Sequence, residues 1–579
     1  STRRTVARGS GRRVKDQQSG LKRRSSPVAR QQGMTAGMTA VEISLALVIL
    51  AVAGAILVPA YQSYREGALI SAAIADIRLI GAAIDNYKIR TGEFPENLGD
   101  VGYGTRRDPF GNVYRYVPLH GSVALSDSVL QVESLGNQRD LELGDDYLLF
   151  TTGEQTVVPQ FVPMVFVGYG IVAPEFDYSD YADMDVSGKV VVYLDGEPPS
   201  SDGRYFGGGR PTVYSTPEAK KRIALSKGAR GSLLVPVVDG DPEAMWRRTR
   251  QEFAFEDLSL AYAVPGHFSA MLHPALGQWL FADALYDWQQ VRTMASRGVV
   301  RSFHLPARLR FEGAFLSRDV LSPNIVARIP GRDPVLRQSA VVVSAHYDHL
   351  GLGPEIGGDS IYNGVVDNAL GVAGVLEMAR VLGGLQRPPR RTVIFLISTA
   401  EEKGLLGTQF FLDHPPLPRS QMAANVNVDG LAFTGSFDSI IGIGAELSTL
   451  GRSLSEVARR LDLEVEELPD LFWGAESFSR SDQKAFAERG VPSILVNEGF
   501  QLHGMTEEES VAASIRWLQT RYHTPFDDLE QPLDWRAVEQ HCGVVLALVY
   551  TLAEDSRDPE WFQGTPYLYE RLLSRALGE

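Results

Sequence analysis

The chain has 579 residues, a formal net charge of −15 at neutral pH and an ordinary hydrophobic content of 44%. That length exceeds what one hydrophobic core supports, so we expect about three or four domains. Residues 1–33 hold ten Lys and Arg against one Asp, so the remainder carries −24. Such an acidic body argues against nucleic acid as a partner, and the single cysteine, Cys542, excludes an internal disulfide.

The chain opens with a basic, Ser-rich segment that is followed by an apolar run. Residues 1–37 contain few large apolar side chains and are expected to be disordered. Residues 43–58 contain no charge and end at Pro59, which predicts a transmembrane helix over about residues 41–61. Because the positive flank comes first, the N-terminus should stay in the cytoplasm and the rest should lie outside. On hydropathy alone this segment would be a simple signal anchor.

Glu42 lies at the edge of the apolar run, where a carboxylate is costly and usually functional. The sequence G-M-T-A-V-E, residues 37–42, resembles the prepilin-peptidase site of type IV pilins and type II secretion pseudopilins. The resemblance covers residues 38–146 and implies cleavage after Gly37, which makes Met38 the first mature residue. It also implies that Glu42 pairs with the amine of a neighbouring subunit, and that pseudopilins or other type II secretion components are partners.

Residues 150–305 predict a β-rich domain. Its strand and helix patterns lie at Phe161–Gly170, Gly188–Leu194, Ala219–Lys227 and Ser232–Val238. The runs V-F-V-G-Y-G-I-V-A-P-E-F-D-Y and A-L-S-K-G-A-R-G-S-L-L-V resemble a protease-associated domain. The resemblance implies a domain that accompanies a peptidase and shapes substrate access without carrying chemistry. Residues 239–305 indicate no particular function.

Strands and helices alternate over residues 306–579, which predicts an α/β sandwich with a mixed, largely parallel sheet. A strand that begins near Ser322 should lead into the centre of that sheet. The later expected elements are the strands Val341–Ser344, Val393–Ser398, Asn425–Val428 and Ser493–Val496 and the helices Gly371–Leu382, Leu405–Asp413, Leu450–Leu461 and Trp535–Ala553. Residues just past the carboxyl ends of such strands converge on one crevice. His346, Glu401 and Asp429 follow three of these strands and, with Asp367 and His523, make a plausible cage for a pair of metal ions.

The runs S-A-H-Y-D-H, G-V-V-D-N-A-L-G, S-T-A-E-E-K-G and N-V-N-V-D-G resemble the M28 family of zinc peptidases, across about residues 320–556. The resemblance implies two zinc ions, with Asp367 bridging both. The ligands that it implies are His346, Asp367, Glu402, Asp429 and His523. It further implies that Glu401 is the general base and that Asp348 orients the site. Ser481, Asp482 and Tyr522 resemble family positions near the substrate.

The M28 resemblance implies a di-zinc exopeptidase, first of all an aminopeptidase that removes N-terminal residues from peptides with a metal-bridged hydroxide. With the predicted anchor, the enzyme would be a single-pass protein of a bacterial inner membrane whose catalytic domain is periplasmic or extracellular. A carboxypeptidase, a single-zinc enzyme similar to glutaminyl cyclase, and a pseudopilus subunit with a binding or display domain remain alternatives. His349, Asp359 and His503 are interpreted as structural.

Overall fold

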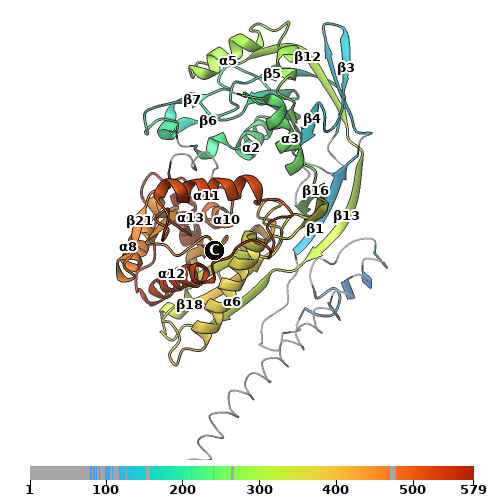
Figure 1. Ribbon diagram of the computed structural model, residues 1–579. Helices are drawn as coiled ribbons and strands as arrows, with labels where there is room; N and C mark the ends of the chain where they lie inside the picture. The colour runs from blue at the N-terminus through green and yellow to red at the C-terminus, as the bar shows by residue number, and fades with distance from the viewer. Residues whose placement is uncertain are drawn as a thin grey trace, which may run out of the picture. The chain divides into compact units, whose positions relative to one another are not determined.

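The computed structural model (Figure 1) describes residues 117–578 apart from 126, 151–156, 210, 239, 262–266, 470–471 and 473–477, together with scattered positions between 79 and 107. Residues 80–107 and 111–579 belong to one compact unit. The transmembrane helix expected over residues 41–61 and the processing-site residues Gly37, Met38 and Glu42 lie outside the described residues. Within the described part of the chain, no helix is both long enough and apolar enough to cross a bilayer.

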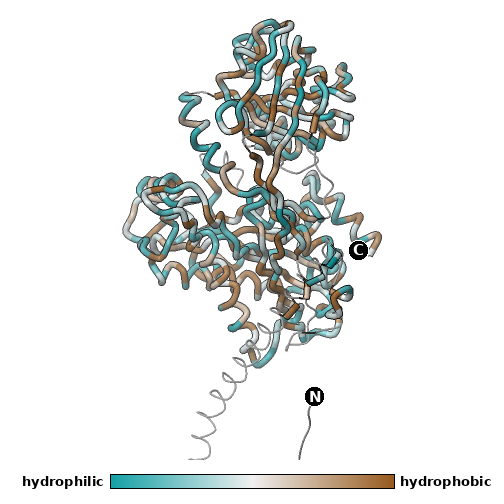
Figure 2. The backbone as a smooth tube through the Cα atoms, turned by 90° about the vertical axis from the view of Figure 1, so that its right-hand side faces the viewer, coloured by the Kyte–Doolittle hydropathy of each residue, from teal (hydrophilic) through white to brown (hydrophobic). Residues whose placement is uncertain are grey.

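A β-rich domain is built on an eight-stranded sheet in the order β3-β2-β12-β5-β8-β9-β11-β4. In β12 (Phe303–Glu312) apolar and polar residues alternate, and the apolar ones are buried, as expected for a strand with one face on a core. Figure 2 shows apolar (brown) and polar (teal) residues interchanging along the strands of this domain. Its other elements are β2 (Val129–Ser134), β3 (Asn137–Leu141), β4 (Tyr147–Leu149), β5 (Val157–Phe166), β6 (Val172–Ala173), β7 (Tyr178–Ser179), β8 (Val190–Leu194), α2 (Pro217–Ser226), β9 (Gly231–Val235), α3 (Pro242–Glu252), β11 (Phe268–Leu272), α4 (Leu276–Leu280) and α5 (Trp288–Ser296).

The β-rich sheet includes residues that the sequence assigned elsewhere. The strands expected over residues 150–238 correspond to β5, β8 and β9, and the expected helix corresponds to α2. Strands β2, β3 and β4 lie in the same sheet, so the sheet begins ahead of the boundary expected at residue 150. The likeness of this domain to a protease-associated domain stays a prediction.

A three-stranded antiparallel sheet joins the β-rich domain to a second domain. It consists of β10 (Asp257–Leu260), β1 (Val117–Ala124) and β13 (Phe315–Ser322), with β1 in the middle. Val117, Leu119 and Leu260 of this sheet pack against Ala400 and Leu406 of the second domain. Because Ala400 directly precedes Glu401 in the sequence, the three-stranded sheet supports the segment that carries Glu401.

The second domain has a seven-stranded sheet in the order β14-β18-β15-β19-β22-β20-β21. Four neighbouring pairs of strands are parallel and two are antiparallel, which confirms the predicted α/β fold with a mixed sheet. The strands are β14 (Ile325–Ile329), β15 (Ala340–His346), β18 (Thr392–Ser398), β19 (Met422–Asn427), β20 (Ser439–Ile443), β21 (Glu464–Glu466) and β22 (Ser493–Glu498), and a separate hairpin is formed by β16 (Gly351–Ile356) and β17 (Asp359–Tyr362). The strand expected to lead into the centre, β14, instead lies at the edge, antiparallel to β18.

Helices cover both faces of the seven-stranded sheet. One apolar cluster joins the central strands to α6 (Leu370–Gly383), α8 (Leu450–Arg460) and α12 (Trp535–Glu554). A second cluster joins them to α7 (Leu406–Asp413) and α10 (Gln483–Glu488). The remaining helices are α11 (Glu507–Thr520) and α13 (Leu568–Leu577). Since both faces are covered, β15 and β19 are buried along their whole length, as is usual for parallel strands.

Candidate active site

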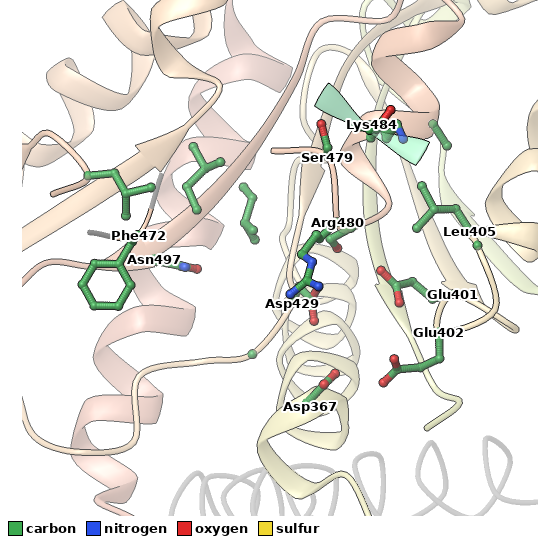
Figure 3. A pocket seen from close by; sticks show the side chains of 18 of the residues that line it. Asp367, Glu401, Glu402, Leu405, Asp429, Phe472, Ser479, Arg480, Lys484 and Asn497 are labelled. Atoms are coloured by element: carbon green, nitrogen blue, oxygen red, sulfur yellow. The ribbon is translucent and has the colours of Figure 1, made fainter. Parts of the chain in front are cut away.

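Three neighbouring parallel strands bring a histidine and three carboxylates to one edge of the seven-stranded sheet. His346 is the last residue of β15, Glu401 and Glu402 follow β18, and Asp429 follows β19. Because these strands are parallel, their carboxyl ends lie at the same edge. Figure 3 shows the side chains of Glu401, Glu402 and Asp429 at one pocket, together with that of Asp367.

Asp367 lies in the middle of this cluster, in the turn Val365–Ala369 that precedes α6. One of its oxygens, Oδ1, is 3.3 Å from Nε2 of His346, and the other, Oδ2, is 3.4 Å from Nε2 of His523. The same nitrogen of His346 is 3.1 Å from Asp429, and the same nitrogen of His523 is 3.3 Å from Glu402. Asp367 therefore offers a separate oxygen to each of two groups of side chains.

The donor atoms of the cluster fit a metal ion. Two sets of three ligand atoms each lie within 4.8 Å of one another, and they belong to His346, Asp367 and Glu402 and to His346, Glu401 and Asp429. Imidazole nitrogen and carboxylate oxygen are common ligands of zinc in proteins.

Three buried polar atoms of the cluster make no hydrogen bond in the described part of the chain, although one of them, Nε2 of His523, lies 3.3 Å from Glu402 and 3.4 Å from Asp367. These atoms, Oε1 of Glu401, Nε2 of His349 and Nε2 of His523, have no hydrogen-bond partner among the residues that the structure describes. Buried polar atoms are nearly always satisfied in native proteins, so unpaired ones require an explanation. A ligand bound between them would supply the missing interactions.

The buried charges of the cluster shift its pKa values strongly. Burial raises the pKa of the Glu401 carboxyl well above its usual range, and the nearby Asp429 raises it further. Burial alone would lower the pKa of His346, but the neighbouring carboxylates outweigh burial and raise it well above its usual value. The neighbouring carboxylates likewise overcome burial at His523 and raise its pKa to about 9. The cluster therefore takes up protons unless a cation occupies it, because metal ions and protons compete for the same ligands.

Asp348 contacts the cluster from outside. Its backbone carbonyl is 3.0 Å from Nδ1 of His346, which leaves Nε2 of that ring facing the carboxylates. Its own carboxylate accepts hydrogen bonds from the backbone N–H groups of Glu401 and Glu402, at 3.1 and 3.2 Å. Asp348 thus links the end of β15 to the segment after β18.

The three residues expected near the substrate occupy different places. Tyr522 lines the cavity beside the cluster and stacks on His523, with ring centroids 3.8 Å apart. Ser481 also lines the cavity, although it is buried and accepts a hydrogen bond from Asn427 at 2.7 Å. Asp482 is fully buried and accepts a hydrogen bond from Ser398 at 2.6 Å, so it lies beneath the site.

The interpretation of His349 as purely structural missed its contact with the cluster. Its Nδ1 lies 2.8 Å from Glu402 and 3.9 Å from Asp367. His349 follows His346 by three residues, and this short spacing is the sequence feature that indicates a place beside the same site. His503, in contrast, pairs with Asp438 at 2.8 Å.

A cavity of about 1260 Å³ opens above the cluster. Asp367, Glu401 and Asp429 lie on its wall together with apolar side chains such as Phe472 and Leu405 (Figure 3). Ligand sites usually combine an apolar lining with a few convergent polar groups, and their volumes are about 300–1,000 Å³. This cavity has that character.

The second domain is thus an α/β domain with a candidate metal site. Residues 324–549, less than half of the chain, match the model of Peptidase family M28. Over 224 residues the chain is 27% identical to aminopeptidase YwaD of Bacillus subtilis, which covers 38% of this chain and 42% of that protein.

Other proteins are similar to this chain as well. A vacuolar membrane protease of Clavispora lusitaniae is 36% identical over 132 residues, which are 22% of this chain and 12% of that protein. The matches to the two curated relatives therefore span less than half of each relative's length. A solved aminopeptidase from Aneurinibacillus sp. strain AM-1 aligns over 75% of this chain and 83% of its own, with 17% identity and a TM-score of 0.43.

Replacement of Asp367 tests whether the cluster binds metal. Asp367→Ala removes the carboxylate that faces both groups, so we expect zinc affinity to fall at least about 100-fold, measured by competition with a chromogenic chelator. The control is Asp359→Ala on β17, whose carboxylate accepts a hydrogen bond from the backbone of Ile361 outside the cluster. Zinc affinity that is unchanged in Asp367→Ala, in a protein with native circular dichroism, would exclude this cluster as the metal site.

Proposed function

We propose that the chain is a di-zinc metallo-exopeptidase and that it is most directly an aminopeptidase. The observation that carries this proposal is the convergence of Asp367, Glu402, Asp429 and His523 on one cavity, with Glu401 on the same wall and His346 in contact with Asp367 and Asp429. The names of the relatives, aminopeptidase and protease, support the same class of reaction.

In this proposal, His346 and Asp429 hold one zinc ion and Glu402 and His523 hold the other, while Asp367 contributes one oxygen to each. The separate contacts of the two Asp367 oxygens, with His346 and with His523, favour two ions over one. Bound zinc would supply Lewis-acid polarisation of the peptide carbonyl and a lower pKa for a water molecule.

Glu401 is proposed as the general base and Asp348 as the residue that orients it. Oε1 of Glu401 is buried at the cavity and has no hydrogen-bond partner among the described residues, so it is free to accept a proton from the attacking water. The same oxygen can then deliver that proton to the nitrogen of the leaving amine. Asp348 holds the backbone of Glu401 in place, and Tyr522 borders the cavity where the substrate would lie.

A carboxypeptidase is the second candidate, because Arg480 lines the same cavity. Figure 3 shows the side chains of Arg480 and Asp429 at the same pocket. A guanidinium binds carboxylates with two parallel hydrogen bonds, so Arg480 could hold the C-terminal carboxylate of a peptide near the metal ligands. An aminopeptidase would place the opposite end of the peptide there.

The N-terminal segment is proposed to anchor the enzyme in a bacterial inner membrane, as a pseudopilin-like helix with type II secretion components as partners. The uncharged run over residues 43–58 and the basic flank before it support this proposal.

A charge in the apolar run tests the anchor. Val52→Arg adds about 2.5–3.5 kcal/mol to the free energy of inserting the helix into the membrane. The chain should therefore leave the membrane fraction of expressing cells. Val52→Leu should leave the membrane fraction unchanged. Equal amounts of both variants in the membrane fraction would contradict a spanning helix here.

Glu401→Gln tests the general base. Because the amide cannot accept the proton, turnover should fall about 10²–10⁴-fold. Zinc content should persist, because the proposed ligands remain. Glu488→Gln, which changes another glutamate of the cavity wall, is the control and should keep turnover within about threefold. Turnover near that of the unchanged chain in Glu401→Gln would remove Glu401 from this role.

Peptides with blocked ends distinguish the two exopeptidases. The full chain, loaded with zinc, is given one peptide with both ends free, with its N-terminus acetylated, or with its C-terminus amidated, and product release is followed by mass spectrometry. An aminopeptidase should fail only on the acetylated peptide, and a carboxypeptidase only on the amidated one. If no form is cleaved despite bound zinc, the peptidase proposal fails, and a cyclase-like or binding function is favoured.

A further inference from the structure

Asp527 is a fully buried carboxylate that lies four residues after His523. Its two oxygens accept hydrogen bonds from the backbone N–H of Val366, at 3.0 and 3.1 Å, and one of them accepts from that of Asp367, at 3.0 Å. The side-chain amide of Gln531 donates to its Oδ1 at 2.5 Å. The carboxylate is thus surrounded by hydrogen-bond donors.

The backbone of Asp527 makes a further contact with the same turn. Its carbonyl accepts a hydrogen bond from the N–H of Val365 at 3.1 Å. Three consecutive N–H groups, those of Val365, Val366 and Asp367, therefore point at one residue. The turn that presents Asp367 is held by a segment about 160 residues later in the chain.

The segment that contains Asp527 also presents His523. The backbone of His523 has a φ of +55°, in the left-handed region that residues with side chains seldom adopt, so its loop must be held by its surroundings. The hydroxyl of Thr524 bonds to the carbonyl of Arg521 at 2.7 Å, and the N–H of Asp527 bonds to the carbonyl of Thr524 at 3.3 Å. These bonds tie Thr524, the residue after His523, to Arg521 and to Asp527.

We propose that Asp527 is a positioning residue that fixes Asp367 and His523 relative to each other and so tunes the affinity of the site for zinc. The inference rests on the proposed function, since it takes these two residues as metal ligands. Nε2 of His523 lies 3.4 Å from Oδ2 of Asp367. Asp527 accepts a hydrogen bond from the backbone N–H of Asp367 and follows His523 by four residues in the chain. Residues that orient metal ligands typically change metal affinity or activity by about 10–100-fold when they are replaced.

The test compares Asp527→Asn with the unchanged full chain. The amide keeps the shape of the carboxylate, but its NH₂ group cannot accept a hydrogen bond. At least one of the hydrogen bonds that Asp527 accepts from the backbone N–H groups of Val366 and Asp367 is therefore lost. We expect the zinc dissociation constant, measured by chelator competition, to rise about 10–100-fold. The Tm of the zinc-free protein should change by no more than a few degrees, whereas a purely structural role would lower this Tm and leave the affinity of the folded protein unchanged.

Two further variants keep the result interpretable. Asp528→Asn alters the neighbouring carboxylate, which accepts a hydrogen bond from the N–H of Glu530 at 2.9 Å, and should leave zinc affinity unchanged. Gln531→Leu removes the side-chain donor to Asp527, together with the acceptor for the indole N–H of Trp517. It should raise the dissociation constant about threefold to tenfold, and it decides the matter if Asp527→Asn does not fold. Suppose that the unchanged chain binds zinc and cleaves peptides. Unchanged zinc affinity in a folded Asp527→Asn or Gln531→Leu variant then overturns the positioning role and leaves the proposed function standing. Failure of the unchanged chain to bind zinc overturns both this role and the proposed function.

Discussion

The molecule is organised around a concentration of buried negative charge at one edge of the seven-stranded sheet. Asp367, Glu401, Glu402 and Asp429 face one another with His346 between them. Two like charges 4 Å apart repel by about 4 kcal/mol at an effective dielectric constant of 20. Such a cluster persists in a folded protein only if protons or cations balance it, and the raised pKa of Glu401 is the response of the chain alone. The same repulsion that opposes folding gives the cluster its attraction for a divalent metal.

The loops that carry these charges are tied to one another by a small number of polar side chains. Asp348 bonds to the backbone of Glu401 and Glu402. Asn368, which is buried, donates to the carbonyl of Val428 at 2.9 Å and accepts from the N–H of Gly430 at 2.9 Å, on either side of Asp429. Every bond of this kind joins segments distant in sequence, so the geometry of the cluster depends on the whole domain rather than on any one loop.

Much of the second domain could be predicted from its sequence, because parallel strands covered on both faces are continuous apolar runs and the residues that follow them are conspicuous. The ends of β15, β18 and β19 were located in this way, and family resemblance supplied the order of the ligands. The edge strand β14 was misplaced, since an apolar run does not reveal which neighbour it pairs with. His349 was passed over, and Asp527 was not considered, because their contacts join residues far apart in the chain. In the β-rich domain, β2 and β3 were assigned to the preceding segment and β4 to no domain, because short strands carry little information about the sheet they enter.

The β-rich domain contributes to the cavity without contributing to the cluster. Thr216 and Lys221, at the start of α2, and His267 lie on the cavity wall, while all the side chains proposed as metal ligands come from the second domain. Lys221 is held by Glu218 at 3.3 Å and lies over the ring of Phe150, so its ammonium group has a defined position on that wall. Both domains therefore line the cavity, whereas the candidate metal ligands come from the second domain. The three-stranded sheet packs against Ala400 and so supports the segment that carries Glu401.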